Sequence, residues 1–92
     1  SAVCGTHTHV VTGDERILPR GTAYLTDIGM TGPLYSVIGF DPRSVLPRFL
    51  TALPTRFEVG SGPVVVNAVQ IDIEAGSGRA VAIERIARIV DT

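Results

Sequence analysis

The sequence predicts a mixed α/β (α+β) fold that is rich in β-strands and contains one short kinked helix near residues 42–52. Three observations lead to this prediction. Apolar and polar residues alternate from Val69 to Glu74, as on a strand with one covered face. The 92 residues include 10 Gly and 6 Pro, which excludes a coiled coil or a long helical bundle. Apolar residues at helical spacing follow Asp41-Pro42.

Short strands and loops are expected in the first 40 residues. Residues 1–5 form the end of a buried strand, and the polar residues 6–22, which include both histidines, form a loop. Residues 23–28 form a second short strand. Residues 29–33 form a turn, because glycine supplies positive φ and proline fixes the exit, and residues 35–40 form another extended run.

The helix is expected to begin at Asp41, a favourable N-cap residue, with Pro42 at the first helical position. Pro47 removes a backbone donor and clashes with the preceding turn, so the helix over 42–52 should be kinked or split, and Pro54 should end it. Its apolar side carries four residues at helical spacing, namely Val45, Leu46, Phe49 and Leu50.

The last third of the chain is predicted to be β-structure that ends in a hairpin. Residues 56–59 form a strand and residues 60–63 form a turn. Further on, Gly76-Ser77-Gly78 turns the chain, and residues 79–90 run back as the partner strand. Glu84-Arg85 interrupts the alternation, which favours a β-bulge there. The alternative is a short helix marked by Ile83, Ile86 and Val90.

The composition limits the classes of function. A formal net charge of −1 excludes a mainly electrostatic binder of nucleic acid or anionic membranes. No apolar run reaches the ~18–20 residues of a membrane span. With 3 Phe, 2 Tyr and no Trp there is no stacking platform for a long nucleic acid. A single cysteine and the lack of a leader favour a cytoplasmic location, and the start inside an apolar stretch without Met favours a piece of a longer protein.

The strongest chemical signal is Gly5-Thr6-His7-Thr8-His9, which follows the first predicted strand and contains both histidines. Loops at the carboxyl ends of strands bind ligands in α/β sheets, and imidazole is a common ligand of Zn, Fe and Mn. The glycine would let the backbone turn sharply beside a metal. A catalytic metal usually needs three or more protein ligands, and the local candidates for a third are Cys4, Asp14, Glu15 and Asp27.

Other interpretations of the same residues stay open. The two histidines could be incidental residues of an exposed loop. Cys4, His7 and His9 could form a mononuclear zinc site. The chain could also be a small non-enzymatic β-rich interaction module, in which an exposed sheet edge within residues 63–90 would mediate self-association into a homo-oligomer.

Longer runs surround the histidine motif. They are Gly5–Val10, Asp14–Pro19, Gly21–Pro33, Ser36–Gly39, and Arg48–Thr51 followed by Pro54. In this order, and over nearly the whole chain, they resemble the bacterial YmdB-type metallophosphoesterases, calcineurin-like enzymes that cleave 2′,3′-cyclic nucleotides at the 2′ ester. The resemblance implies that residues 1–92 are the C-terminal third of such a protein, a fragment of a single metallophosphoesterase domain. The family fold is a calcineurin-like β-sandwich flanked by helices.

The resemblance also implies a site. The last metal motif of the family is Gly-x-His-x-His, and by that match His7 would ligate the second and His9 the first of two divalent metal ions, drawn from Fe, Mn, Mg and Zn. The supporting or cleft residues would be Gly5, Thr6, Thr8 and Asp27. The substrate would be a cyclic nucleotide or another small phosphodiester. The other family ligands and the general acid have no match in this chain, so these residues alone are expected to be inactive and to bind metal weakly.

Overall fold

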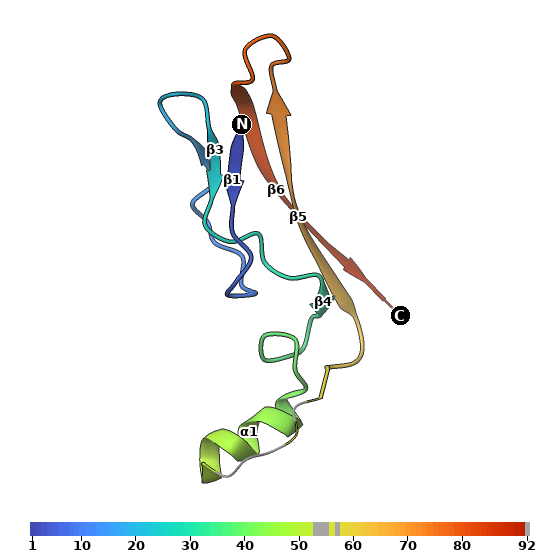
Figure 1. Cartoon of the computed structure of the whole chain (residues 1–92). Helices are drawn as coiled ribbons and strands as arrows, with labels where there is room; N and C mark the ends of the chain where they lie inside the picture. The colour runs from blue at the N-terminus through green and yellow to red at the C-terminus, as the bar shows by residue number, and fades with distance from the viewer. Residues whose placement is uncertain (53–55, 57, 92) are drawn as a thin grey trace.

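The computed structural model describes residues 1–52, 56 and 58–91. Two three-stranded sheets and one helix are found in this part of the chain (Figure 1). The first sheet has the order β1-β3-β2, formed by Ala2–Cys4, Ala23–Leu25 and Arg16–Ile17. The second has the order β4-β5-β6, formed by Gly32–Pro33, Val64–Ile73 and Ala80–Val90. The predicted β-rich α/β fold with one short helix, α1 (Pro42–Thr51), is confirmed.

The first sheet contains the two strands that were expected early in the chain. β1 runs parallel to β3, with Val3 opposite Tyr24, and β2 pairs with β3 in the antiparallel direction. The prediction that the first strand is buried is wrong, because β1 lies at the edge of the sheet and Val3 is 56% exposed. The expected loop 6–22 contains β2, which has only two residues and therefore shows no alternation in the sequence.

Residues 32–40 differ from the expectation in two ways. Gly32–Pro33 forms the short strand β4 beside Val64 and Val65 of β5, rather than only a turn. The expected extended run at 35–40 is wrong, because Val37 and Phe40 exchange two backbone hydrogen bonds of 2.8 and 3.0 Å around a tight turn. An apolar run predicts a strand, but the positive φ available to Gly39 lets the chain reverse here.

Helix α1 has the predicted start. The carboxylate of Asp41 accepts a hydrogen bond of 2.8 Å from the backbone N–H of Arg43, and Pro42 occupies the first turn. Pro47 lies inside one uninterrupted helix, so the helix is not split. Because proline has no backbone N–H, Pro47 removes only one intrahelical hydrogen bond, the one to the carbonyl of the residue four positions earlier. The chain leaves the helix through Ala52, which has a left-handed conformation, and the predicted stop at Pro54 lies outside the described residues.

The hairpin of β5 and β6 is the longest element, and its turn at residues 75–77 confirms the predicted reversal. The predicted bulge at Glu84-Arg85 is wrong, because these residues pair in register with Gln70 and Val69. The irregularity lies nearer the turn, where Asp72 pairs with Ala82 and Ile73 pairs with Ala80. The alternation fails at 84–85 because both faces of β6 are exposed there, so neither face requires apolar residues.

The expected strand at 56–59 includes Phe57, which lies outside the described residues. Its last member, Val59, forms an isolated bridge with Phe40. Nearby backbone hydrogen bonds from Asp41 to Glu58 and from Gly60 to Gly39, of 2.8 and 2.9 Å, tie this segment to the start of α1. The turn at 37–40 is therefore held from outside as well as by its own hydrogen bonds.

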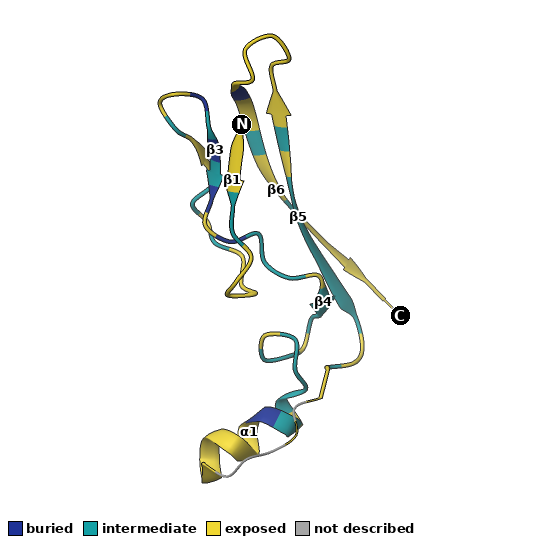
Figure 2. Cartoon of the chain, viewed as in Figure 1, coloured by how far each residue is buried: buried dark blue, intermediate teal, exposed yellow. Residues whose placement is uncertain are grey.

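The molecule is elongated, with α1 and the hairpin turn at opposite ends (Figure 1). Its extents are 55 × 29 × 16 Å, and its radius of gyration of 17.0 Å exceeds the ~12 Å of a compact domain of this length. The buried apolar side chains among the described residues are Ala23, Leu25, Val45 and Ala80. Two of them, Ala23 and Leu25, belong to β3, and Ala80 is the first residue of β6, so buried positions appear on both strands (Figure 2). Within the described ranges, no helix has the length and apolar character needed to cross a membrane.

Of the four residues on the predicted apolar side of α1, only Val45 is buried. The other three are exposed, and Phe49 and Leu50 keep 75% and 84% of their accessible surface. The helical periodicity was therefore correct, but most of the apolar side meets solvent in this chain.

Candidate functional site

The loop that carries both histidines leaves β1 at Gly5. The N–H of Gly5 donates to the carbonyl of Leu25 at 3.1 Å, and the carbonyl of Gly5 accepts from the N–H of Ile28 at 2.9 Å. The parallel pairing of β1 and β3 thus continues past the strand ends. A Cβ added at Gly5 would lie 2.0 Å from the carbonyl oxygen of Thr26. Only glycine allows the two backbones to approach this closely.

Asp27 holds the centre of the histidine loop. Its side chain is almost fully buried, and one carboxylate oxygen accepts hydrogen bonds from the backbone N–H and the hydroxyl of Thr8, at 2.7 and 2.6 Å. The other oxygen accepts from the N–H of Gly29 at 2.8 Å. The Thr8 hydroxyl, followed by the N–H groups of Gly29 and Thr8, holds the pKa of Asp27 below its usual value against the opposing effect of burial. Asp27 therefore anchors the residue between the two histidines.

His7 and His9 lie on opposite sides of this anchored residue, and both are exposed. The backbone of His9 has φ +67°, a left-handed conformation that is uncommon for a residue with a side chain. Its Nδ1 lies 2.9 Å from the carbonyl oxygen of Ile38, in the tight turn before α1. The structure thus brings a second segment, 29 residues away in the sequence, against one of the two imidazoles.

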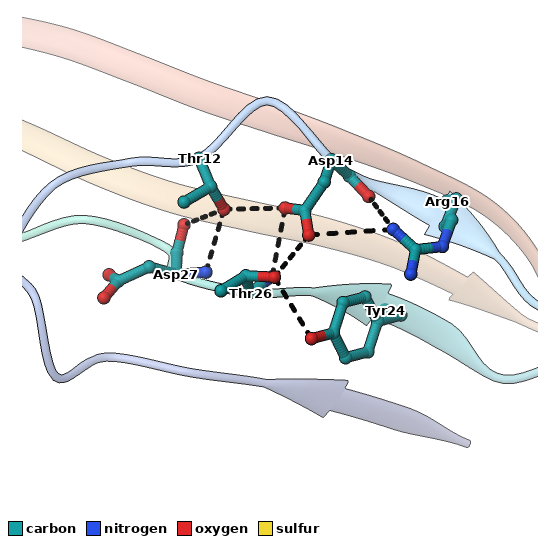
Figure 3. A network of polar contacts seen from close by, with 6 residues as sticks. All are labelled: Thr12, Asp14, Arg16, Tyr24, Thr26 and Asp27. Carbon is teal, nitrogen blue, oxygen red and sulfur yellow. Dashed lines mark hydrogen bonds and ion pairs between the residues drawn. The ribbon is translucent and has the colours of Figure 1, made fainter.

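A second polar network fixes the end of the same loop (Figure 3). Asp14 accepts hydrogen bonds from the hydroxyl of Thr12 at 2.7 Å and from the hydroxyl and N–H of Thr26. Thr12 in turn binds the backbone of Asp27, whose N–H donates to the Thr12 hydroxyl at 3.0 Å. The hydrogen bonds from Thr26 and Thr12 lower the pKa of Asp14 from 3.8 to about 2. This network joins the end of the loop, at Thr12 and Asp14, to the exit of β3.

The lowered pKa of Asp14 predicts a pH dependence of stability. A carboxylate with a depressed pKa in the folded state stabilises the fold above its unfolded pKa, and this contribution is lost as the pH falls. The difference in unfolding temperature between the wild-type chain and Asp14→Asn should therefore be largest at neutral pH and shrink between pH 3.8 and about 2. Thermal unfolding followed by circular dichroism measures it.

Thr26→Val is the matched comparison, because Thr26 provides the hydrogen bonds that lower this pKa most. The variant should lose most of the same pH-dependent difference, and adding Asp14→Asn should change little more. A difference between wild type and Asp14→Asn that stays constant down to pH 2 would contradict this assignment.

Of the four candidate third ligands, Asp27 holds Thr8 between the histidines, and the other three lie in other environments. Cys4 is half-buried on β1, Asp14 is engaged by Thr12 and Thr26, and Glu15 forms an ion pair with Arg85 of β6. Among the residues that the structure describes, no group of three or more His, Cys, Asp or Glu side chains is placed to hold a metal ion.

The sequence assigned no role to two residues near His9. Ser36 and Ile38 lie in or next to the turn that contacts His9, and the sequence pattern marks them only within the run Ser36–Gly39. The run Ile38-Gly39 is a weak turn signal, because isoleucine is rarely found at positive φ. Thr6, which was considered as a cleft residue, is exposed in the loop.

Comparisons with known proteins agree on one family. A family model described as "YmdB-like protein" matches residues 1–86. The chain is 55% identical over 86 residues to the 2′,3′-cyclic-nucleotide 2′-phosphodiesterase of Bacillus subtilis, an alignment that covers 94% of this chain and 33% of that protein.

Two crystal structures share the fold over nearly the whole chain. A hypothetical protein from Thermus thermophilus superposes with a TM-score of 0.89 at 45% identity, covering 97% of this chain and 34% of its own. A novel phosphatase from Mycoplasma pneumoniae superposes with a TM-score of 0.92 at 36% identity, covering 99% of this chain and 33% of its own. The chain thus spans about a third of the length of these relatives. The match of the family model over residues 1–86 establishes that the chain belongs to the YmdB-like protein family.

Proposed function

We propose that this chain is the C-terminal part of a single metallophosphoesterase domain, and that the complete protein hydrolyses 2′,3′-cyclic nucleotides or related small phosphodiesters. The observation that carries the proposal is the histidine loop, which Asp27 holds at Thr8 and the Ile38 carbonyl holds at His9. The relative at 55% identity is named as a 2′,3′-cyclic-nucleotide 2′-phosphodiesterase, which supports this substrate class. A cytoplasmic location agrees with such a substrate.

His7 and His9 are proposed as ligands in a centre of two divalent metal ions, His9 to the first and His7 to the second. The fit rests on the donors: two exposed imidazoles, two residues apart, on a loop whose backbone is fixed between them. Imidazole suits Fe and Zn, and Mn and Mg remain candidates where carboxylates supply the other ligands. The remaining ligands and the general acid are proposed to come from the part of the protein outside this chain.

Divalent ions held by these residues would supply Lewis-acid stabilisation of the phosphate charge and a water of lowered pKa. The residues of this chain would have a supporting part in that chemistry. His7 and His9 would donate neutral ring nitrogens, and the hydrogen bond to Ile38 would orient the ring of His9. Asp27 would keep Thr8, and with it the spacing of the two imidazoles, constant during turnover.

Single substitutions in the full-length protein test this assignment. His7→Ala and His9→Ala should each lower the turnover of 2′,3′-cyclic AMP by orders of magnitude and reduce the metal content measured by inductively coupled plasma mass spectrometry. Far-ultraviolet circular dichroism should be unchanged, because both side chains are exposed. Gln70→Ala, which removes an exposed side chain of β5, is the control and should keep full activity. Retained activity in both histidine variants would refute the proposed ligands.

The second candidate, a non-enzymatic interaction module, draws on the exposed apolar side chains. Val3 on the edge strand β1 and Phe49 on α1 keep 56% and 75% of their surface, and such surfaces favour association. A module of this kind would form a homo-oligomer that survives His7→Ala and His9→Ala, without any hydrolysis of cyclic nucleotides. Analytical ultracentrifugation of the same variants, combined with the activity assay, separates the two candidates.

A further inference from the structure

The turn that contacts His9 has an unusual backbone. Its two central residues, Ile38 and Gly39, have φ +46° and +98°, and Val37 and Phe40 close it with two backbone hydrogen bonds. Positive φ at both central positions is the signature of a type I′ turn, in which Asn-Gly is favoured. A β-branched residue is an outlier there. The side chain of Ile38 is 48% exposed, so burial contributes little to offset the cost of this conformation.

The peptide unit between Ile38 and Gly39 is held from both sides. The N–H of Gly39 donates to the hydroxyl oxygen of Ser36 at 3.0 Å, and that hydroxyl donates to the carbonyl of Pro33 at 2.8 Å. The carbonyl of Ile38 belongs to the same peptide unit and lies 2.9 Å from Nδ1 of His9. Because a trans peptide is planar, with its N–H and C=O pointing in opposite directions, the Ser36 hydroxyl fixes the direction of the Ile38 carbonyl.

The direction of this carbonyl decides the protonation pattern of the His9 ring. A carbonyl oxygen only accepts hydrogen bonds, so the Nδ1 that it contacts must carry the hydrogen. In the neutral imidazole, Nε2 then keeps the lone pair that binds a metal. Without this contact, either ring nitrogen could carry the hydrogen, and the ring could rotate.

We propose that Ser36 is a positioning residue, which holds the Ile38-Gly39 peptide so that His9 presents an unprotonated Nε2 in a fixed orientation. The metal-binding consequence rests on the function proposed above, whereas the state of the His9 ring does not. Ser36 acts on His9 through the Ile38-Gly39 peptide, whose N–H its hydroxyl oxygen accepts.

The test compares Ser36→Ala with the full-length wild-type protein, without added metal. Nitrogen-15 NMR of the histidine rings reports which nitrogen carries the hydrogen. The His9 signals are assigned by their loss in His9→Ala. Wild type should show the hydrogen on Nδ1 alone, and Ser36→Ala should show a mixture of both forms. Ser77→Ala, which removes a hydroxyl in the β5–β6 turn, is the matched control and should resemble wild type.

Zn²⁺ titration of the same proteins measures the consequence for the site. Ser36→Ala should bind Zn²⁺ about 10–100-fold more weakly, the usual effect of losing a partner that orients a ligand. If Ser36→Ala does not fold, the double variant Ser36→Ala/Ile38→Asn replaces it. Asparagine is favoured in a type I′ turn, and the variant still lacks the Ser36 hydroxyl. The nitrogen-15 signals of its His9 ring then test the positioning role.

The outcomes separate the two proposals. A His9 ring that keeps its hydrogen on Nδ1 alone in Ser36→Ala would overturn the positioning role. A mixed ring state in Ser36→Ala, together with unchanged Zn²⁺ affinity in His9→Ala, would support the positioning of the ring and refute His9 as a metal ligand.

Discussion

Gly5→Ala is expected to lower the unfolding temperature markedly and to displace the histidine loop. The added Cβ would lie 2.0 Å from the carbonyl oxygen of Thr26, which is backbone and cannot rotate away. β1 would have to move from β3, and the hydrogen bonds from Gly5 to Leu25 and from Ile28 to Gly5 would lengthen. Overpacking of this kind costs about 1–3 kcal/mol and occasionally more. At roughly 4–8 °C per kcal/mol for a domain of this size, the shift is easily measured by thermal denaturation.

Gly13→Ala is the matched control, because, apart from Gly13 and its two chain neighbours, no heavy atom of the described residues lies within 4 Å of a Cβ built there. It lies in the same segment, between the histidines and β2, and its unfolding temperature should stay close to that of the wild type. Equal unfolding temperatures for Gly5→Ala and Gly13→Ala would show that the close approach of β1 and β3 is not required.

Asp27→Asn is the second substitution with a large expected effect. The two carboxylate oxygens accept three hydrogen bonds, two from Thr8 and one from Gly29. Asparagine has nearly the same shape but offers one oxygen and one donor group, so a donor must face either the N–H of Thr8 or that of Gly29. The loop between His7 and His9 should lose its fixed position, and the metal affinity of the full-length protein should fall about 10–100-fold.

The measurement is Zn²⁺ titration of the full-length variant, together with hydrogen exchange of the Thr8 and Gly29 amides. At least one of these two amides should exchange faster in Asp27→Asn, because asparagine offers an acceptor to only one of them. Asp72→Asn makes the same chemical change at an exposed position of β5 and should leave both readouts unchanged. Unaltered exchange rates of both the Thr8 and the Gly29 amide in Asp27→Asn would contradict the anchoring role of Asp27, whatever the metal affinity.

Local signals predicted most of the secondary structure. The N-cap at Asp41, the proline after it and the glycine turn at 76–78 each describe contacts within a few residues, and the structure confirms them. The misplaced bulge and the unexpected turn at 37–40 depend on strand register and on contacts with residues 58–60, which are distant in the sequence. Burial was the least predictable feature. An apolar residue such as Val3 can be buried, but its presence in the sequence does not show that this chain buries it.

In the candidate site, too, local features could be predicted from the sequence and contacts between distant residues could not. The histidine pair and its glycine were visible in the sequence, because their chemistry and spacing are local. The residues that hold the histidine loop could not be recognised in the sequence, because Asp27 is 19 residues from Thr8 and Ile38 is 29 residues from His9. Asp27 was noted as a supporting residue, yet its contact with Thr8 could not be deduced from spacing. No sequence pattern pointed to Ser36, because its role depends on the backbone conformation of Ile38 and Gly39.

The β5–β6 turn has a practical consequence for experiments on this protein. Apart from each glycine and its chain neighbours, no heavy atom of the described residues lies within 4 Å of a Cβ built at Gly76 or Gly78, and α1 lies at the far end of the molecule (Figure 1). Exposed turns of this kind tolerate inserted residues well. A fluorophore, a spin label or a short affinity epitope placed at residue 76 would therefore report on the protein without entering the histidine loop. Such a probe would follow conformational changes on ligand binding in real time, while the histidine loop keeps its own sequence.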